Sequence, residues 1–321
     1  MSTRSIRLAV VGAGHMGSLH AKKVVELAGA GEPVTLAGIV DVRADRAQAL
    51  GAELGAGVLG GDRGVAAHAD AAIVAVPTVA HAGVVGPLLA AGLDVLIEKP
   101  IAASIDEART LIDTARRHGR ILQVGHLERF NPAVRSVRGR VVRPRFVEAH
   151  RLGPFPGRAT DVDVVRDLMI HDLDLLLHLI GEEPERVDAI GIPVLSPEID
   201  IANARLVHPG GCVANLTASR VSVEPMRRLR IFQPSGYLSI DLLAKSAVFF
   251  HRREGEPGAA PRIEMEKLEI VQEDALLAQL RSFLEAVRTR GDPAVSGIDA
   301  VRTLRSALRV VEAMPPLERL Q

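Results

Sequence analysis

The stretch Gly12-Ala13-Gly14-His15-Met16-Gly17 decides the fold of the N-terminal half of this chain. It follows an apolar run, Ile6–Val11, and it opens a segment with the helical spacing of apolar residues, Met16–Leu27. Glycines at this spacing also occur in ordinary turns. Between a strand and a helix, however, G-x-G-x-x-G is typical of dinucleotide binding. The sequence therefore predicts a dinucleotide-binding turn.

Each part of this turn has a physical role in the prediction. Gly12 permits the tight turn, Gly14 lets the backbone approach a pyrophosphate, and Gly17 allows close packing of the helix on the strand. The N–H groups of the first helical turn, with His15 and Met16, would then face the phosphates, which the positive end of the helix dipole attracts.

An acidic residue ends the second predicted strand, Val34–Val40. Asp41 lies 24 residues after Gly17, where a carboxylate accepts hydrogen bonds from the ribose hydroxyls of a dinucleotide. Its charge would repel a 2′-phosphate, so we expect NAD rather than NADP, although Arg43 and Arg46 leave NADP open.

The first 125 residues alternate short apolar runs with helical segments. Further strands are predicted over Ala71–Val76, Asp94–Ile97 and Arg120–Val124, and further helices over Arg43–Leu54, Ala80–Ala91 and Ser104–His118. Almost continuously apolar strands separated by helices indicate a parallel sheet that is covered on both faces. We expect an α/β domain over residues 1–125, a doubly wound parallel sheet of the Rossmann type.

The pattern changes after residue 125. An arginine- and proline-rich stretch, Arg135–Pro156, precedes a strongly apolar helix predicted over Val162–Ile180. Alternating segments then predict strands at Arg186–Val194, Ala202–Val207, Cys212–Ser219, Arg228–Phe232, Tyr237–Ile240 and Ala247–His251, with closing helices at Ala275–Arg290 and Ile298–Met314. We expect residues 126–321 to form an α+β domain with a mostly antiparallel sheet, whose last helices pack back on the first domain.

Composition excludes several classes of protein. The chain has 39 basic and 39 acidic residues, so no net charge favours nucleic acid or an anionic membrane. Its one cysteine, Cys212, excludes an internal disulfide framework and a thiolate zinc cluster, and we expect no metal. We find neither the apolar segment of a signal peptide nor a run of about 18 apolar residues, so we expect a cytoplasmic protein.

The ends of two predicted strands carry polar residues where an open α/β sheet binds its ligand. Val76-Pro77-Thr78 leads to His81, and Glu98-Lys99-Pro100 follows the strand over Asp94–Ile97. We expect Val76, Pro77, Thr78, His81 and Glu98 to bind the cofactor. The Lys99 ammonium would polarise a substrate hydroxyl, or bridge the substrate and the nicotinamide ribose; a lone lysine is more often a surface residue.

Asp167 and His171 lie four residues apart on the predicted apolar helix, and Asp174 and His178 continue the same face. A carboxylate one turn before a histidine orients the imidazole and raises its basicity. Three readings remain open from spacing alone: a catalytic His171, the solvated side of an amphipathic helix, and a metal site.

These motifs, in this order, resemble those of the Gfo/Idh/MocA oxidoreductases over nearly the whole chain. In that family the lysine of the E-K-P segment and the histidine of the D-x-x-x-H segment bracket the reacting carbon. The resemblance implies that Lys99 and His171 are catalytic, with Asp167 as helper. It also implies reversible hydride transfer between a secondary alcohol carbon of a sugar and the nicotinamide, with the proton acceptor undecided between Lys99 and His171.

The segment Gly125-His126-Leu127-Glu128-Arg129-Phe130-Asn131-Pro132 resembles the G-H-x-E-R-F-N-P stretch of the UDP-N-acetylglucosamine 3-dehydrogenase-like subgroup. The resemblance implies substrate contacts from His126, Glu128, Arg129 and Asn131, with Arg129 on a phosphate. An alternative reading makes Asn131 the cap of a helix with Pro132 at its first position. The arginines between Arg135 and Arg151 are expected to be solvated, with a substrate diphosphate as an open alternative for one of them.

The best substrate prediction is thus UDP-N-acetylglucosamine, oxidised at carbon 3. Oxidation of a free polyol or sugar such as an inositol is a rival, and so is a non-catalytic NAD-dependent ligand sensor. The resemblance further implies a homodimer or homotetramer, formed through the exposed face of the C-terminal sheet.

Overall fold

The computed structural model describes residues 4–155, 162–255 and 260–316, and the chain divides into two compact units. The first consists of Met1–Leu127 and Asp274–Val301, and the second of Glu128–Glu273 and Arg302–Gln321. The chain thus passes from the first unit to the second after Leu127, and helix α8 (Ala275–Thr289) returns to the first unit.

The first unit is built on a five-stranded sheet in the order β2-β1-β3-β4-β5. Its strands are β1 (Ile6–Val11), β2 (Val34–Val40), β3 (Ala71–Val74), β4 (Asp94–Ile97) and β5 (Leu122–Val124). Every pair of neighbouring strands is parallel. The expected doubly wound parallel sheet is therefore confirmed, with β3 and β5 each two residues shorter than predicted.

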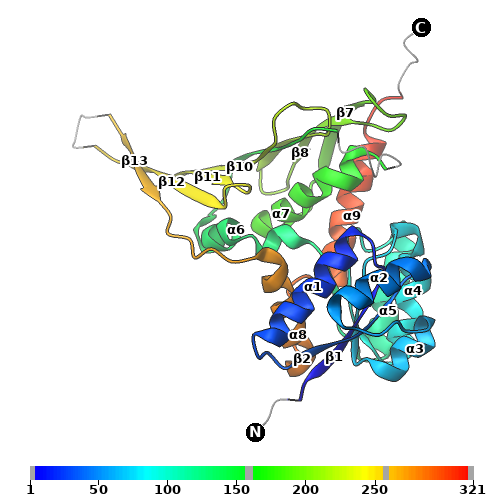
Figure 1. The fold of residues 1–321 in the computed structure, drawn as a ribbon. Coiled ribbons are helices and arrows are strands. Elements are labelled where there is room, and N and C mark those ends of the chain that lie inside the picture. The colour runs from blue at the N-terminus through cyan, green and yellow to red at the C-terminus, as the bar shows by residue number, and fades with distance from the viewer. Residues whose placement is uncertain (1–3, 156–161, 256–259, 317–321) are drawn as a thin grey trace. The chain divides into compact units, whose positions relative to one another are not determined.

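Helices cover both faces of this sheet. They are α1 (His15–Gly29), α2 (Ala44–Leu54), α3 (Gly61–His68), η1 (Thr78–Ala80), α4 (His81–Ala90) and α5 (Ile105–Arg117). Helices α1 and α8 pack together on one face and α3, α4 and α5 on the other (Figure 1). Helix α3 was not predicted, because its eight residues, Gly-Asp-Arg-Gly-Val-Ala-Ala-His, have no apolar periodicity.

Helix α8 completes the core of the first unit although it comes 150 residues after β5 in the chain. Its buried Leu280, Phe283 and Leu284 join the apolar cluster that includes Leu8 of β1 and Val24 of α1. Burying side chains of this size stabilises a fold by about 1.5–3 kcal/mol each. The first unit is therefore incomplete without a segment from near the C-terminus.

The second unit is built on an eight-stranded sheet in the order β13-β12-β11-β10-β6-β9-β8-β7. The strands are β6 (Phe146–Leu152), β7 (Arg186–Ile192), β8 (Ile201–Val207), β9 (Val213–Ser219), β10 (Met226–Gln233), β11 (Gly236–Asp241), β12 (Ser246–Arg253) and β13 (Arg262–Lys267). Only β6 and β9 pair in parallel, so the expected mostly antiparallel sheet is confirmed.

Two of these strands were not predicted. Strand β6 lies at the centre of the sheet, within the arginine- and proline-rich stretch Arg135–Pro156, whose last residue is outside the described residues. Its inward positions are Val147, Ala149 and Arg151, and the buried arginine breaks the apolar alternation that identifies a strand. Strand β13 is largely exposed and charged, and therefore has no such pattern.

The remaining helical elements are η2 (Leu127–Phe130), α6 (Pro132–Val137), η3 (Arg138–Arg140), η4 (Val165–Met169), α7 (Ile170–Ile180) and α9 (Gly297–Glu312). Buried residues of α6, α7 and α9 pack on one face of the eight-stranded sheet (Figure 1). Its other face carries half-buried and exposed side chains, as the alternating burial of β8 and β9 shows. In the described parts of the chain, no helix combines the length and apolar character needed to cross a membrane.

A buried ion pair holds the connection between β7 and β8. Arg220 is 1% exposed, and its Nε donates to Asp200 Oδ1 at 2.7 Å. The other carboxylate oxygen of Asp200 accepts three backbone N–H groups from Val194, Leu195 and Ser196. Removing one partner of such a pair is costly because it leaves the other charge buried and uncompensated.

We expect Arg220→Met to lower the free energy of unfolding by about 3 kcal/mol or more, because Asp200 keeps its charge in a buried site. Urea denaturation monitored by circular dichroism measures this loss. The double variant Arg220→Met/Asp200→Asn is the control and should lose less. A single-variant loss below about 1 kcal/mol would show that the pair is not needed for stability.

Candidate active site

The glycine turn has the geometry that its sequence predicted. Gly12 has φ +100°, and a Cβ built on it would lie 2.4 Å from the carbonyl oxygen of Ala75. A Cβ on Gly17 would lie 1.7 Å from the carbonyl oxygen of Gly12. A Cβ on Gly14, by contrast, meets nothing within 4 Å. Two of the glycines are thus required by close approaches within the protein, and the third leaves the backbone open to a ligand.

Helix α1 presents an N-terminus suited to an anion. Gly14 is the N-cap and has no side chain to occupy the N–H groups of the first turn, and that turn contains no acidic residue. These N–H groups have no partner within the helix. His15 is exposed and Met16 half-buried at this end of α1. The turn therefore fits the pyrophosphate of a dinucleotide.

Asp41 lies against the glycine turn. Its Oδ2 accepts from the backbone N–H of Ala13 at 2.6 Å, and its Oδ1 accepts from the N–H of Arg43 at 2.8 Å. The carboxylate is thus held next to the turn, as binding of a ribose requires. The Arg43 guanidinium, which left NADP open, pairs with Asp45 at 2.7 Å instead.

His81 connects the ends of two neighbouring strands. Its Nδ1 lies 2.9 Å from the carbonyl oxygen of Pro100, and its Nε2 lies 3.0 Å from that of Val76. The imidazole is 1% exposed, so both of its nitrogens face the protein backbone. Pro77 is exposed and Thr78 half-buried at the start of η1. His81 therefore lies between the two predicted cofactor-binding loops, within hydrogen-bond distance of both; its direct contact with a cofactor stays a prediction.

One functional candidate was missed at the sequence level. His20 of α1 is fully buried, and its Nε2 lies 2.7 Å from Oε1 of Glu98. Gly125 adjoins the same carboxylate, since a Cβ there would lie 3.1 Å from Glu98 Oε2. The spacing of His20 from Gly17 and Val24, on the buried face of α1, is the signal that would have identified it. His20 thus fixes the carboxylate that precedes Lys99.

Lys99 itself is half-buried at the start of the loop after β4. Its peptide bond to Pro100 is cis. Its neighbours on either side are both anchored, Glu98 by His20 and Pro100 by His81. The backbone that carries the predicted catalytic lysine is therefore held from two sides within the first unit.

In the second unit, Asp167 and His171 do not share one regular α-helix. The predicted helix Val162–Ile180 begins as a π-helical turn, η4, which contains Asp167, and becomes α-helical at Ile170. π-helical turns are frequent at functional sites. Both side chains are half-buried. Their catalytic roles stay predictions.

Asp174, which follows His171 on the same face of the helix, does not lie on a solvated surface, although the spacing of the residues allowed that reading. Asp174 is 1% exposed and accepts two hydrogen bonds from Arg129, at 2.8 and 2.7 Å. Thr303 Oγ1 also donates to it at 3.2 Å. The reading of a solvated face is therefore wrong at Asp174. Among the described residues, no group of three or more histidine, cysteine or acidic side chains has the arrangement of a metal site.

The segment Gly125–Pro132 is held by internal contacts. Asn131 caps α6, since its Oδ1 accepts from the N–H of Ala133 at 3.1 Å and Pro132 occupies the first helical position. The capping alternative is therefore confirmed. The Asn131 amide also donates to Glu128 Oε2 at 3.2 Å. These contacts, with the Arg129–Asp174 pair, hold Glu128, Arg129 and Asn131 from within the protein, and their contacts with a substrate stay predictions.

Arg151 is a further buried arginine, which the sequence did not predict. Arg151 of β6 donates to both oxygens of Asp172, at 3.0 and 2.8 Å, and to Glu128 Oε1 at 2.8 Å. Burial alone would lower the pKa of Arg151, but the two carboxylates raise it above its ordinary value. The guanidinium therefore stays charged, and the expectation of a solvated arginine is wrong here. His126, in the first unit, is 1% exposed, and its substrate contact stays a prediction.

The pKa of His81 is lowered, mainly by burial, and carbonyl groups of Val76 and Pro100 oppose this only in part. The unfolded chain then binds a proton more readily than the fold, so stability rises with pH through this range and is lost as pH falls below about 6.5. We expect His81→Gln to show a smaller drop in melting temperature between pH 7.5 and 5.5 than the wild type.

Differential scanning fluorimetry across that pH range tests the prediction. The exposed His118→Gln is the matched control and should keep the wild-type pH dependence. Equal pH dependence in wild type and His81→Gln would contradict the assignment.

Models of known families match both parts of the chain. Residues 6–126 match the oxidoreductase family with an NAD-binding Rossmann fold, GFO_IDH_MocA, and residues 133–239 match the GFO/IDH/MocA C-terminal domain. The chain is 38% identical over 306 residues to UDP-N-acetylglucosamine 3-dehydrogenase from Acidithiobacillus ferrooxidans, covering 95% of this chain and 96% of the relative.

Solved structures agree with this match. A structure of UDP-N-acetylglucosamine 3-dehydrogenase from Acidithiobacillus ferrooxidans superposes with a TM-score of 0.89, at 37% identity, over 97% of this chain and 98% of that one. The scyllo-inositol dehydrogenase from Lactobacillus casei, solved with NAD(H) and scyllo-inositol, gives a TM-score of 0.79 at 20% identity over 97% of each chain. At that identity the second likeness shows the fold alone.

Proposed function

The chain belongs to the Gfo/Idh/MocA family of NAD-binding oxidoreductases, and we propose that it oxidises UDP-N-acetylglucosamine at carbon 3 with NAD as the acceptor. The observation that carries the proposal is the 38% identity to a UDP-N-acetylglucosamine 3-dehydrogenase over 95% of the chain. The Gly125–Pro132 segment, which resembles the same subgroup, supports it.

Lys99, Asp167 and His171 have different roles in the proposed oxidation. Bound NAD supplies the hydride acceptor. His171 takes the proton of the 3-hydroxyl, with Asp167 orienting its imidazole, while the Lys99 ammonium stabilises the developing alkoxide and shares in the proton transfer. His20 and His81 keep the backbone around Lys99 in place through Glu98 and Pro100. We propose that this rigidity sets the position of the ammonium relative to the hydroxyl.

Two rivals are separated from this proposal by their ligands. A polyol dehydrogenase such as an inositol dehydrogenase has no use for a uridine diphosphate, and it would oxidise inositol and ignore UDP. A ligand sensor would bind NAD and a sugar without producing NADH. Retention of Lys99, Asp167 and His171 together in one chain favours an enzyme.

We expect the wild type to form NADH from UDP-N-acetylglucosamine, and Lys99→Ala and His171→Ala each to lower kcat by about 100-fold or more, because proton transfer contributes about 10²–10⁴-fold. NADH absorbance measures the rate. Arg43→Ala, which removes an exposed cation paired with Asp45, is the control and should keep the wild-type kcat.

UDP alone should raise the melting temperature of the wild type, since a ligand that binds only the folded state stabilises it. No stabilisation at millimolar UDP, together with turnover of inositol, would refute the nucleotide-sugar proposal. Unchanged NADH formation in both Lys99→Ala and His171→Ala would refute the catalytic assignment.

We propose that two or four copies of the chain associate through the face of the eight-stranded sheet that its own helices leave open. Neighbouring strands β6, β10, β11 and β12 place four aromatic rings side by side there: Phe146, Phe232, Tyr237 and Phe250. Consecutive ring centroids are 5.7, 5.1 and 4.4 Å apart. All four are half-buried in the single chain, so a second copy would remove apolar surface from water.

The cytoplasmic location stays a prediction.

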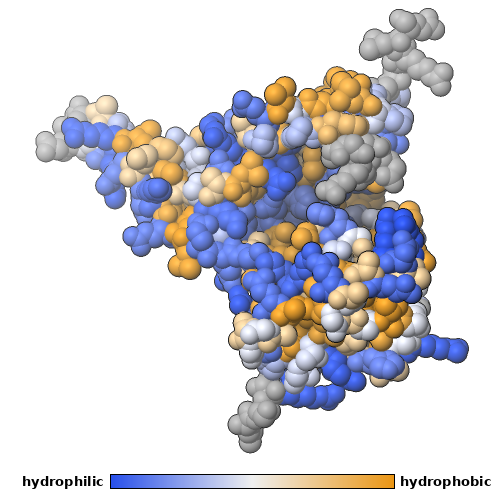
Figure 2. All heavy atoms as spheres, in the orientation of Figure 1, coloured by the Kyte–Doolittle hydropathy of each residue, from blue (hydrophilic) through white to orange (hydrophobic). Residues whose placement is uncertain are grey.

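The neighbouring hairpin extends this apolar surface. Ile263 and Met265 of β13 are 70% and 66% exposed, and Figure 2 shows apolar side chains among charged ones over β12 and β13. Exposed apolar groups of this kind mark association surfaces.

A charge placed among the rings should prevent association. We expect Tyr237→Glu to lower the molar mass measured by multi-angle light scattering, because burying an unpaired carboxylate is costly. Val42→Glu, at a fully exposed position in the first unit, is the control and should keep the wild-type mass. A wild type that is monomeric, or a Tyr237→Glu variant of unchanged mass, would contradict the proposal.

A further inference from the structure

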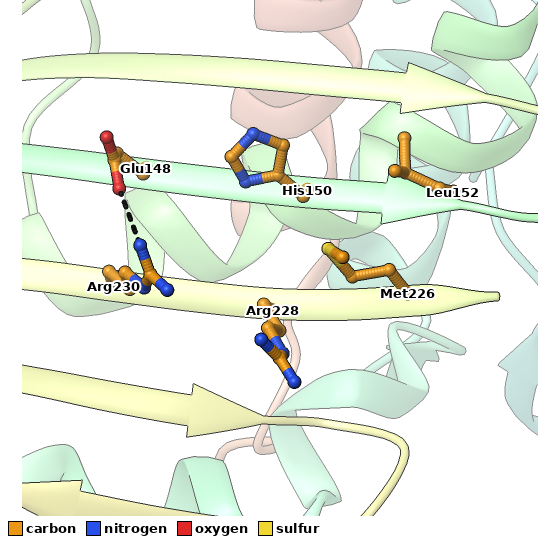
Figure 3. A pocket seen from close by; sticks show the side chains of 6 residues that line it. All are labelled: Glu148, His150, Leu152, Met226, Arg228 and Arg230. Atoms are coloured by element: carbon orange, nitrogen blue, oxygen red, sulfur yellow. Dashed lines mark ion pairs between the residues drawn. The ribbon is translucent and has the colours of Figure 1, made fainter. Parts of the chain in front are cut away.

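Two adjacent arginines of β10 point to opposite faces of the sheet. Arg227 and Arg228 have nearly equal side-chain exposure, 47% and 49%. Arg228 lies on the open face, in a shallow pocket of about 290 Å³ lined with Glu148, His150 and Met226 (Figure 3). Because side chains alternate along a strand, Arg227 lies on the face that the helices cover, with Leu229 of the core.

Arg227 lies beside the buried ion pairs of that face. It pairs in the sheet with Arg151 of β6, directly across the strand. Its Nη1 is 3.7 Å from Glu128 Oε1, the same oxygen that accepts from Arg151 at 2.8 Å. The Glu128 carboxylate is therefore shared, and the shorter bond goes to Arg151.

The three arginines of this cluster differ in accessibility. The side chains of Arg129 and Arg151 are 7% and 4% exposed and are held by Asp174 and Asp172 through two hydrogen bonds each. The Arg227 side chain is about half exposed. Among the described residues, the one carboxylate within ion-pair distance of it is Glu128, at 3.7 Å. Arg227 is thus the member of the cluster whose guanidinium reaches solvent.

An anion at this place would meet a half-exposed guanidinium. Burial and the neighbouring charge of Arg151 lower the pKa of Arg227, and the carboxylates of Glu128 and Asp172 oppose this. A phosphate beside Arg227 would accept a bidentate pair of hydrogen bonds from its guanidinium.

The cluster also connects Arg227 to the predicted catalytic helix. Arg227 contacts Glu128, which Arg151 joins to Asp172 of α7. Asp172 follows His171 directly in the chain. An anion bound by Arg227 would therefore lie next to the element that carries the proposed base.

We propose that Arg227 binds the diphosphate of the nucleotide-sugar substrate and so selects nucleotide sugars over free sugars. This inference rests on the proposed function. A second source of the same chemistry is the diphosphate of NAD, for which the glycine turn of the first unit is the expected site. The two sources are separated by measuring KM for each substrate.

The test compares three variants of the full-length protein. We expect Arg227→Gln to raise KM for UDP-N-acetylglucosamine by about 10- to 100-fold, the range for loss of a charge-assisted hydrogen bond, with kcat and KM for NAD within about 2-fold of wild type. Arg227→Lys keeps the positive charge but loses the planar guanidinium that donates two parallel hydrogen bonds. Its KM should therefore lie between those of the wild type and Arg227→Gln. Arg228→Ala, on the opposite face, should keep the wild-type KM.

Direct binding gives a readout independent of turnover. Calorimetry with UDP should show weaker binding to Arg227→Gln than to wild type, and uridine, which has no phosphate, should bind both equally. An unchanged KM for the nucleotide sugar in Arg227→Gln, a rise only in KM for NAD, or an equal rise in Arg228→Ala would overturn the inference. If the wild type neither binds UDP nor oxidises the nucleotide sugar, the proposed function fails and the inference with it; a failure confined to Arg227→Gln leaves the function standing.

Discussion

The ion pair of Arg151 with Asp172 and Glu128 organises the second unit. One guanidinium joins the central strand β6, the helix α7 and the η2 turn, with hydrogen bonds of 2.8 to 3.0 Å. Because the group is 3% exposed, each carboxylate must stay where the arginine neutralises it. The contact ties Asp172, the residue that follows His171 in α7, to the central strand of the sheet.

The first unit positions its polar groups by a different device. There the imidazoles of two buried histidines, His20 and His81, hold the loop that carries Lys99. One contacts a carboxylate and the other contacts backbone carbonyl groups on two strand ends. The conformation of the glycine turn requires the absence of side chains. Gly17 approaches the Gly12 carbonyl so closely that a Cβ at this position would clash with it.

Local patterns predicted those elements whose burial follows the period of the backbone. The strands of the first sheet are almost continuously apolar, and all six strands predicted in the second half appear within two residues at each end. Strand β6 was missed because its inward Arg151 interrupts the apolar alternation, and that charge is neutralised by Asp172 of α7 and Glu128 of η2. The π-helical turn at Val165–Met169 was missed for a related reason, since the spacing of apolar residues does not distinguish it from an α-helix.

The glycine turn and Asp41 are features that the sequence by itself determined, because backbone conformation and local spacing specify them. The same holds for the parallel and antiparallel character of the two sheets. Only the tertiary structure decided which polar residues are available to a ligand. Arg129 and Arg151 have the same side-chain chemistry in the sequence as Arg227, yet these two are held by internal partners and Arg227 reaches solvent. Partners at sequence separations of 21 and 45 residues make that difference, and no local pattern contains them.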